Sequence, residues 1–211
     1  MNKTELIDAI IKLEWSMFTT AQNAGGRASC QDDWETFEIM RRSQHLVWAM
    51  DTLESYRADL EAARAVGMNL VAFKYAYMMR ITFPEEYEAI KDRLPPVSPA
   101  KEELVEAICA VHGRWAAEKA EKYPLLSRMG RPLTSAQGGR WAAIDNYLYS
   151  ELLTYSEQTL ALCLRDTKAA EARGENLSIK IVENTAHLYG YPDLDSLEAS
   201  LRRSAEKRIQ L

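Results

Sequence analysis

Two stretches of the chain repeat one pattern at a fixed interval, and this repeat constrains the fold more than any other feature of the sequence. Trp34 and Trp141 are 107 residues apart, and so are Gly67 and Gly174. An internal repeat can decide the whole architecture of a protein. We therefore predict two diverged copies of one unit, residues 1–93 and 94–211. The matching positions are Trp34, Leu46, Leu53, Gly67, Asn69 and Leu70, and then Trp141, Leu153, Leu160, Gly174, Asn176 and Leu177.

Each copy has the pattern of a helix, a glycine-containing loop, a long helix, a tight break and a shorter helix. Apolar residues recur every three or four positions from Leu6 to Phe18, which is typical of an amphipathic helix. The first long helix is predicted to begin at Asp32, as its N-cap, and to end at Gly67, which can adopt the left-handed conformation that ends helices. The second long helix is predicted over about residues 140–173.

Capping residues mark the ends of the other predicted helices. Asn2, with Glu5 three residues later, predicts a capping box at the start of the first helix. Ser98 followed by Pro99 predicts the start of the second copy, because proline is favoured in the first helical turn. Asp195 is the predicted N-cap of a helix that runs to the C-terminus. Asn69 caps the helix after the first break, and Pro84 precedes a short helix over residues 85–90.

The sequence therefore predicts an all-α protein. No window alternates apolar and polar residues between turn residues in the way that a strand does. Amphipathic units of this size bury their own apolar faces poorly, so we expect the two copies to pack together about a pseudo-twofold axis. The whole chain, residues 1–211, then forms a single helical domain.

Composition narrows the classes of function. The net charge is -5 and no run of basic residues occurs, which argues against a nucleic-acid partner. No run of about 18 apolar residues predicts a membrane span, and the N-terminus lacks the pattern of a secretory signal. Cys30, Cys109 and Cys163 are odd in number and form no C-x-x-C motif, which fits a reducing compartment. We expect a cytoplasmic protein.

The segment from Gly25 to Asp33 carries the densest set of chemical groups in the chain. It lies just before a predicted helix, and free N–H groups at a helix N-terminus commonly bind anions. One interpretation is a capped helix start with a solvated arginine. The other is a ligand-binding or catalytic loop. A helix N-terminus would favour the thiolate of Cys30, whereas the neighbouring Asp32 and Asp33 would oppose it.

The two copies differ in chemistry at matching places. Glu14 in the first copy corresponds to His112 in the second, while Gly26-Arg27 resembles Gly130-Arg131. We therefore predict a small-molecule site between the copies, in which an arginine binds an anionic group and Asp33 or Glu14 acts as a general base. The predicted catalytic residues are Glu14, Cys30 and Asp33, and the predicted ligand-binding residues are Arg27, Gln31, Asp32 and Arg131.

Two other functions stay open. A non-catalytic helical protein could bind a partner or a second copy of itself. Alternatively, a helical bundle could hold a metal through carboxylates such as Glu35, Glu38, Glu151 and Glu157, although the sequence has no Glu-x-x-His motif. Glu35, Glu38, Arg41 and Arg42 are otherwise explained as surface charge pairs. No motif assigns a cofactor or a reaction.

Several motifs resemble one bacterial family, known as domain of unknown function 4125. They are the segments GGRASCQDDWETFEIMRRSQ and LEWSMF, together with EKYP and GRP, and the later GENL and LYGY. The resemblance covers nearly the whole chain. It implies a bacterial cytoplasmic protein and carries no activity that could be transferred to this one.

Overall fold

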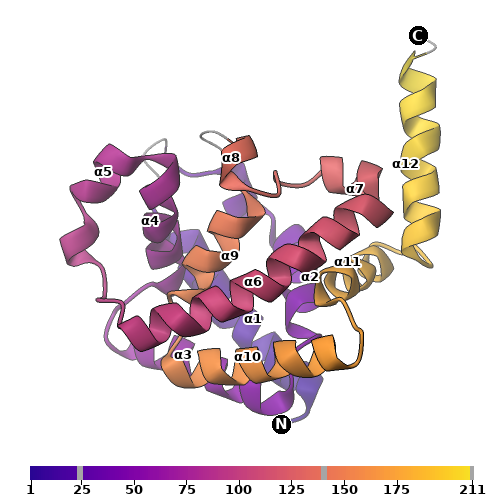
Figure 1. Ribbon diagram of the computed structural model, residues 1–211. Helices are drawn as coiled ribbons and strands as arrows, with labels where there is room; N and C mark the ends of the chain where they lie inside the picture. The colour runs from indigo at the N-terminus through magenta and orange to yellow at the C-terminus, as the bar shows by residue number, and fades with distance from the viewer. Residues whose placement is uncertain (23–25, 139–141, 210–211) are drawn as a thin grey trace.

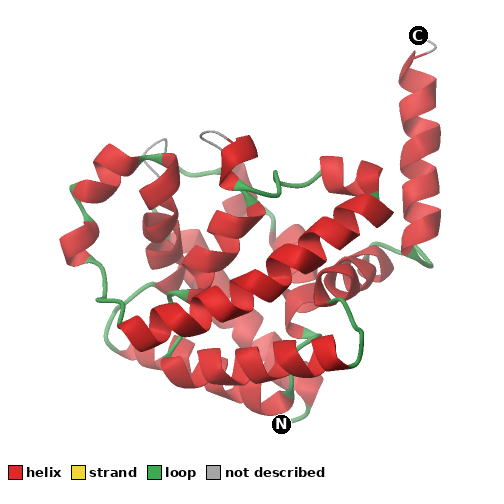
Figure 2. Ribbon diagram, in the orientation of Figure 1, coloured by secondary structure: helices red, strands yellow, loops and turns green. Residues whose placement is uncertain are grey.

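The computed structural model describes residues 1–22, 26–138 and 142–209, and these residues form helices and loops without a strand (Figure 2). The all-α prediction is confirmed. Predicted features at Gly25 and Trp141, and the predicted start of the second long helix near residue 140, lie outside the described residues. The helices are α1 (Lys3–Thr20), η1 (Ser29–Asp32), α2 (Trp34–His45), α3 (Met50–Ala65), α4 (Leu70–Thr82), α5 (Pro84–Glu88), η2 (Lys91–Arg93), α6 (Pro99–Lys122), α7 (Pro124–Arg128), α8 (Ser135–Gly138), α9 (Ile144–Leu152), α10 (Glu157–Ala172), α11 (Leu177–Leu188) and α12 (Leu194–Ile209).

Most of the predicted helix ends are confirmed. Asn2 forms the capping box of α1, and the Ser98 side chain accepts from the backbone of α6 at its first turn. Asn69 caps α4 in the same way. Gly67 and Gly174 have φ angles of 74° and 69°, the left-handed conformation in which a β-carbon is unfavourable. Local sequence therefore decides where these helices begin and end.

The prediction of two uninterrupted long helices is wrong. The first is broken between α2 and α3, where Ala49 is extended, and the second is broken between α9 and α10, where Ser156 is extended. The backbone N–H of Ala49 donates to Asp166 of α10 at 3.0 Å, and that of Ser156 donates to Asp59 of α3 at 2.9 Å. Each break is thus stabilised by a carboxylate from the other helix, because a free N–H at a helix start needs an acceptor.

Two predicted N-caps move by a residue or two. The carboxylate that accepts from the first turn of α2 is that of Asp33, from the Thr36 N–H at 3.0 Å, because Asp32 already belongs to the 3₁₀ turn η1. At α12 the corresponding carboxylate is that of Asp193 rather than Asp195, and it accepts from the backbone N–H of Ser196 at 2.7 Å.

Helices from both predicted halves share one core (Figure 1). Helix α1 packs against α2, α3 and α4, while α6 packs against α9, α10 and α11. Three further contacts join the halves: α3 with α10, α4 with α9, and α11 with α2. Residues near the centre include Leu6, Ile7, Ile10, Leu53, Leu60, Val105, Ile108 and Leu160. The interior is therefore continuous across the predicted boundary at residues 93–94.

Helix α12 stands away from this body and contacts α7 and α11 (Figure 1). Its buried Glu198 accepts from the backbone N–H groups of Leu125 and Leu126, at 2.8 and 2.9 Å, in the first turn of α7. This carboxylate fixes the base of α12. None of the described helices is long and apolar enough to cross a membrane.

Candidate functional site

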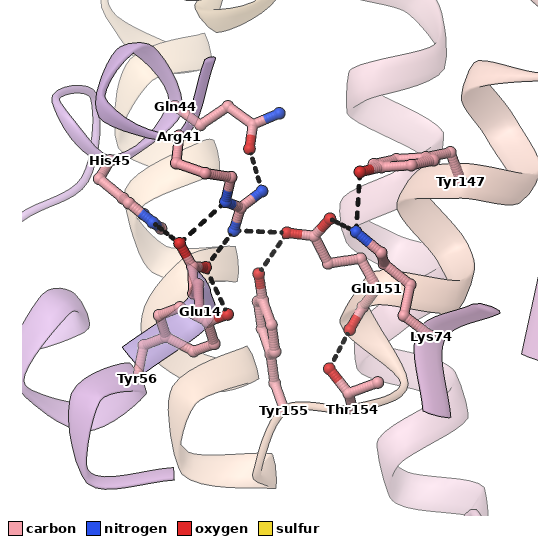
Figure 3. A network of polar contacts seen from close by, with 10 residues as sticks. All are labelled: Glu14, Arg41, Gln44, His45, Tyr56, Lys74, Tyr147, Glu151, Thr154 and Tyr155. Carbon is pink, nitrogen blue, oxygen red and sulfur yellow. Dashed lines mark hydrogen bonds and ion pairs between the residues drawn. The ribbon is translucent and has the colours of Figure 1, made fainter. Parts of the chain in front are cut away.

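A cluster of charged and phenolic side chains crosses the apolar core (Figure 3). At one end Glu14 of α1 is only 1% exposed. Its carboxylate accepts from Arg41 Nε of α2 at 2.9 Å and from the Tyr56 hydroxyl of α3 at 2.8 Å. The ring Nε2 of His45, also on α2, lies 3.0 Å from the same carboxylate. We name this set the central ionic cluster. Its members are Glu14, Arg41, His45, Tyr56, Lys74, Tyr147, Glu151 and Tyr155.

The cluster continues from Arg41 to Glu151 of α9. Arg41 Nη2 is 2.9 Å from one carboxylate oxygen of Glu151, which also accepts from the Tyr155 hydroxyl at 3.0 Å. Lys74 of α4 contacts the other oxygen at 3.3 Å and donates to the Tyr147 hydroxyl at 2.7 Å. Side chains from five helices and the loop after α9 thus form one connected network.

The buried charges in the cluster balance. Burial alone would raise the pKa of Glu14, but Arg41 and His45 outweigh it and hold that pKa well below its usual range. Burial opposes ionisation of Glu151 as well, yet Arg41 and Lys74 lower its pKa to about 2. Both carboxylates are therefore ionised at neutral pH, and two cations compensate them. Buried charges persist in a folded protein when they are paired in this way.

His45 has one ring nitrogen without a partner. An ionised carboxylate only accepts hydrogen bonds, so the nitrogen facing Glu14 carries the hydrogen in this assignment. The other nitrogen, Nδ1, is buried and has no hydrogen-bond partner among the described residues. The ring is completely buried, with Trp48 and Tyr56 beside it. His45 therefore donates to Glu14 from a completely buried ring.

The cluster approaches the surface at Tyr147. Lys74 Nζ lies 4.2 Å from the centroid of the Tyr147 ring, and the guanidinium carbon of Arg131 lies 4.8 Å from it. Arg131 Nη1 also donates to the carbonyl of Ala142 at 3.1 Å. Arg131 is exposed and has no carboxylate partner in the described part of the chain. The ring and the carbonyl therefore fix a guanidinium whose other N–H groups have no partner among the described residues.

Tyr75 connects this region to the loop that precedes α2. Burial raises the pKa of Tyr75, and the nearby groups of Lys74, Tyr147, Cys30 and Arg131 also influence it. The exposed thiol of Cys30 is thus within electrostatic range of the same tyrosine as Arg131. We call Cys30, Tyr75, Arg131 and Tyr147 the surface end of the cluster.

The loop before α2 is held by its own hydrogen bonds. Arg27 donates to Asp32 at 2.7 Å and to the carbonyls of Thr19 and Gln31, each at 2.9 Å. The buried side-chain amide of Gln31 donates to the carbonyl of Phe18 at 2.7 Å. Arg27, Gln31 and Asp32 therefore tie the loop to the C-terminal turn of α1.

The structure separates the predicted site residues into four groups. Arg27, Gln31 and Asp32 hold the loop before α2. Cys30 and Arg131, from the two predicted halves, lie near the same tyrosine. Glu14 belongs to the central ionic cluster and bonds to α2 and α3. Asp33 caps α2, as described above. Whether any of these residues binds a ligand or takes part in a reaction stays a prediction.

Sequence reasoning missed much of the cluster. The prediction that Arg41 forms a surface pair is wrong, because Arg41 is only 8% exposed and its partners lie on α1 and α9. Its neighbour Arg42 does form the expected surface pair with Glu38, at 2.6 Å. A signal was present for Lys74, the single charge between Asn69 and Arg80 in an otherwise apolar helix. An isolated charge at such a position requires a buried partner.

A metal site built from carboxylates is not supported. Within the described ranges, no three His, Cys, Asp or Glu side chains lie close enough together to hold a metal ion. The acidic residues Glu14 and Glu151 are instead occupied by cations of the protein itself.

Comparison with known proteins finds one family. A family model described as "Protein of unknown function (DUF4125)" matches residues 4–199. No curated protein and no solved structure matches the chain.

Proposed function

The chain belongs to the DUF4125 family of proteins of unknown function, and we propose from the site itself that it binds a small molecule with an anionic group at the surface end of the cluster. This proposal depends on one observation, which is the set of partners around the Arg131 guanidinium. Its guanidinium is held over Tyr147 and by the Ala142 carbonyl, but no carboxylate of the described residues neutralises it. A guanidinium fixed in this way can bind a carboxylate or phosphate through two parallel hydrogen bonds.

The surroundings of Arg131 favour an anion further. The ammonium of Lys74 lies on the same tyrosine ring, and its hydrogen bond polarises the Tyr147 hydroxyl. The hydroxyl of Tyr75 adds a donor within electrostatic range. Because these groups belong to a packed network, a ligand would cost them little conformational entropy on binding.

A catalytic role has less support than anion binding does. A general base works best with a pKa near the working pH, whereas the pKa of Glu14 is held well below it and both of its oxygens are occupied. The Thr36 backbone N–H lowers the pKa of Asp33. Of the three predicted catalytic residues, Cys30 alone is exposed and within electrostatic range of Tyr75. We therefore propose binding, with Cys30 as the residue to test for a reaction.

The proposal is tested by thermal shift with phosphate, sulfate, citrate and glycerol 3-phosphate, each followed by isothermal titration. At least one anion is expected to raise Tm, and Arg131→Ala is expected to weaken its binding by about tenfold or more. Arg128→Ala, which removes an exposed arginine of α7, is the matched control and should leave the affinity unchanged. If no anion binds, or if Arg131→Ala binds it as well as the unchanged protein, the proposal fails.

We also propose that residues 1–93 and 94–211 are diverged copies related by a pseudo-twofold axis. Reciprocal contacts support this arrangement: α4 packs on α9 as α11 packs on α2. The pairing of Ala49 with Asp166 and of Ser156 with Asp59 is reciprocal too, since each residue and its counterpart are 107 positions apart. Such an exchange is the pattern expected of a twofold interface, where residue i contacts j and j contacts i.

Equivalent contacts should have similar effects on stability. Asp59→Ala and Asp166→Ala are each expected to lower the free energy of unfolding by about 1–2 kcal/mol, the usual cost of losing a helix cap. Urea denaturation measures both, with Glu54→Gln on the exposed face of α3 as the control. A large loss for one aspartate and none for the other would contradict the proposed equivalence.

A further inference from the structure

A hollow in the surface lies outside the central ionic cluster and shares no residue with the proposed anion site. It has a volume of about 150 Å³ and lies where α4, α5, α6 and α9 meet the linker between the predicted halves. Sites for drug-sized ligands usually measure about 300–1,000 Å³. A hollow of this size fits only a small metabolite. Its lining residues are Tyr77, Arg80, Tyr87, Val97, Glu102, Tyr149 and Leu153.

The wall of this hollow is apolar and already ordered. Tyr87, Val97 and Tyr149 are half-buried and pack against the main core. Tyr77 is buried, and its hydroxyl donates to the carbonyl of Pro95 at 2.8 Å. With that hydroxyl occupied, Tyr77 presents its ring as an apolar surface. The wall therefore suits an aliphatic or aromatic group.

The rim carries one positive and one negative side chain, linked by a tyrosine. The guanidinium carbon of Arg80 lies 4.8 Å from the centroid of the Tyr149 ring. The Tyr149 hydroxyl donates to a carboxylate oxygen of Glu102 at 2.8 Å. Both charged residues are exposed, so their remaining donors and acceptors are accessible from solvent. Opposite charges thus lie within the span of a single small molecule.

This combination selects a class of ligand. An anion would meet Glu102, and a cation would meet Arg80, so a ligand with only one charge gains on one side and loses on the other. A molecule with both charges close together meets a partner for each. We infer that this hollow binds a free α-amino acid with an apolar side chain: its carboxylate pairs with Arg80, its ammonium with Glu102, and its side chain enters between the tyrosines.

The test uses the full chain and three probes of one size. L-leucine carries both charges, L-leucinamide lacks the carboxylate, and 4-methylpentanoate lacks the ammonium. Isothermal titration is expected to give a Kd of about 1 mM or tighter for leucine and binding at least tenfold weaker for each of the other two. Binding of all three with equal affinity, or no binding of leucine, would overturn the inference.

Variants locate the site. Arg80→Gln and Glu102→Gln are each expected to weaken leucine binding by about tenfold or more, because each removes one charged partner. Glu103→Gln changes the neighbouring exposed glutamate of α6 and should bind leucine normally. All three positions are exposed, so circular dichroism should show an unchanged fold. Leucine binding that persists in both Arg80→Gln and Glu102→Gln would also overturn the inference. Arg131→Ala should not affect it, which separates this site from the proposed anion site.

Discussion

Two titratable residues, the buried Glu14 on α1 and the half-buried His112 on α6, are accommodated in opposite ways. Glu14 keeps its charge because Arg41, His45 and Tyr56 surround the carboxylate. The ring of His112 instead lies edge-on to Trp115, 5.0 Å between centroids, and burial lowers its pKa to about 4. One region of the core stabilises a charge with partners, and the other excludes charge by keeping the side chain neutral. We therefore expect different substitutions and different pH ranges to remove the contributions of the two regions to the free energy of unfolding.

The largest expected effect comes from removing a cation of the central ionic cluster. Arg41→Met leaves Glu14 buried without its main partner and deprives Glu151 of one of two. We expect the free energy of unfolding to fall by about 3–5 kcal/mol, measured by urea denaturation. Arg42→Met, which removes a partly exposed ion pair with Asp8 and Glu38, should cost about 0–1 kcal/mol.

A second comparison tests whether the charge itself is the cause. The double variant Glu14→Gln with Arg41→Met removes both partners and should recover part of the stability lost in Arg41→Met alone. If the double variant is as unstable as the sum of the two single variants, lost packing rather than unpaired charge explains the effect.

As the pH falls, the region around His112 should lose its contribution to stability before the region around Glu151 does. The pKa of His112 is about 4 when folded and about 6.5 when unfolded, so falling pH protonates the unfolded state first. The stability contributed by the neutral His112 ring is present above pH 6.5 and is lost as pH falls toward 4, about 3 kcal/mol in all. Glu151, with a folded pKa of about 2, loses its contribution only between about pH 4.3 and 2.

His112→Phe should therefore reduce the loss of stability between pH 6.5 and 4 and leave the loss below pH 4 intact. Urea denaturation at a series of pH values measures both. His187→Gln, at an exposed histidine of α11, is the control and should follow the unchanged protein. An identical loss in His112→Phe and in the unchanged protein would show that the neutral region is not acid-sensitive.

The smallest effect should come from a single hydroxyl of the cluster. Tyr155→Phe removes one donor to Glu151, whose carboxylate keeps Arg41 and Lys74. We expect a loss of about 1.5 kcal/mol in urea denaturation, the contribution of a hydrogen bond to a charged group. Tyr191→Phe, at an exposed tyrosine, should change nothing. A neutral result for Tyr155→Phe would mean that the two cations alone satisfy the carboxylate.

Features set by neighbouring residues could be predicted from the sequence. The caps at Asn2, Asn69 and Ser98 follow from side chains that bond within one turn. The breaks after α2 and α9 could not be predicted in this way, because Leu46–Ala49 contains no glycine or proline and continues the apolar pattern. The acceptor that stabilises the first break, Asp166, lies more than a hundred residues away.

The same distinction between local and long-range contacts explains which residues of the candidate site could be predicted. Glu14 could be singled out because it corresponds to a different residue, His112, in the second predicted copy. Arg41 could not, because the spacing within α2 offers it the same acidic neighbours as Arg42. Only the packing of α1 and α9 around α2 shows which of the two arginines points inward.

The exchange of carboxylates between α3 and α10 also bears on how the protein is made. A ribosome releases α3 long before it has synthesised Asp166, so the Ala49 N–H meets only water during most of translation. Helix α10 cannot complete its own start until it reaches Asp59 on a segment made much earlier. Contacts between such distant residues form slowly, since a long loop must close before they can stabilise anything. The contacts that join α3 and α10 therefore cannot form until α10 has been synthesised.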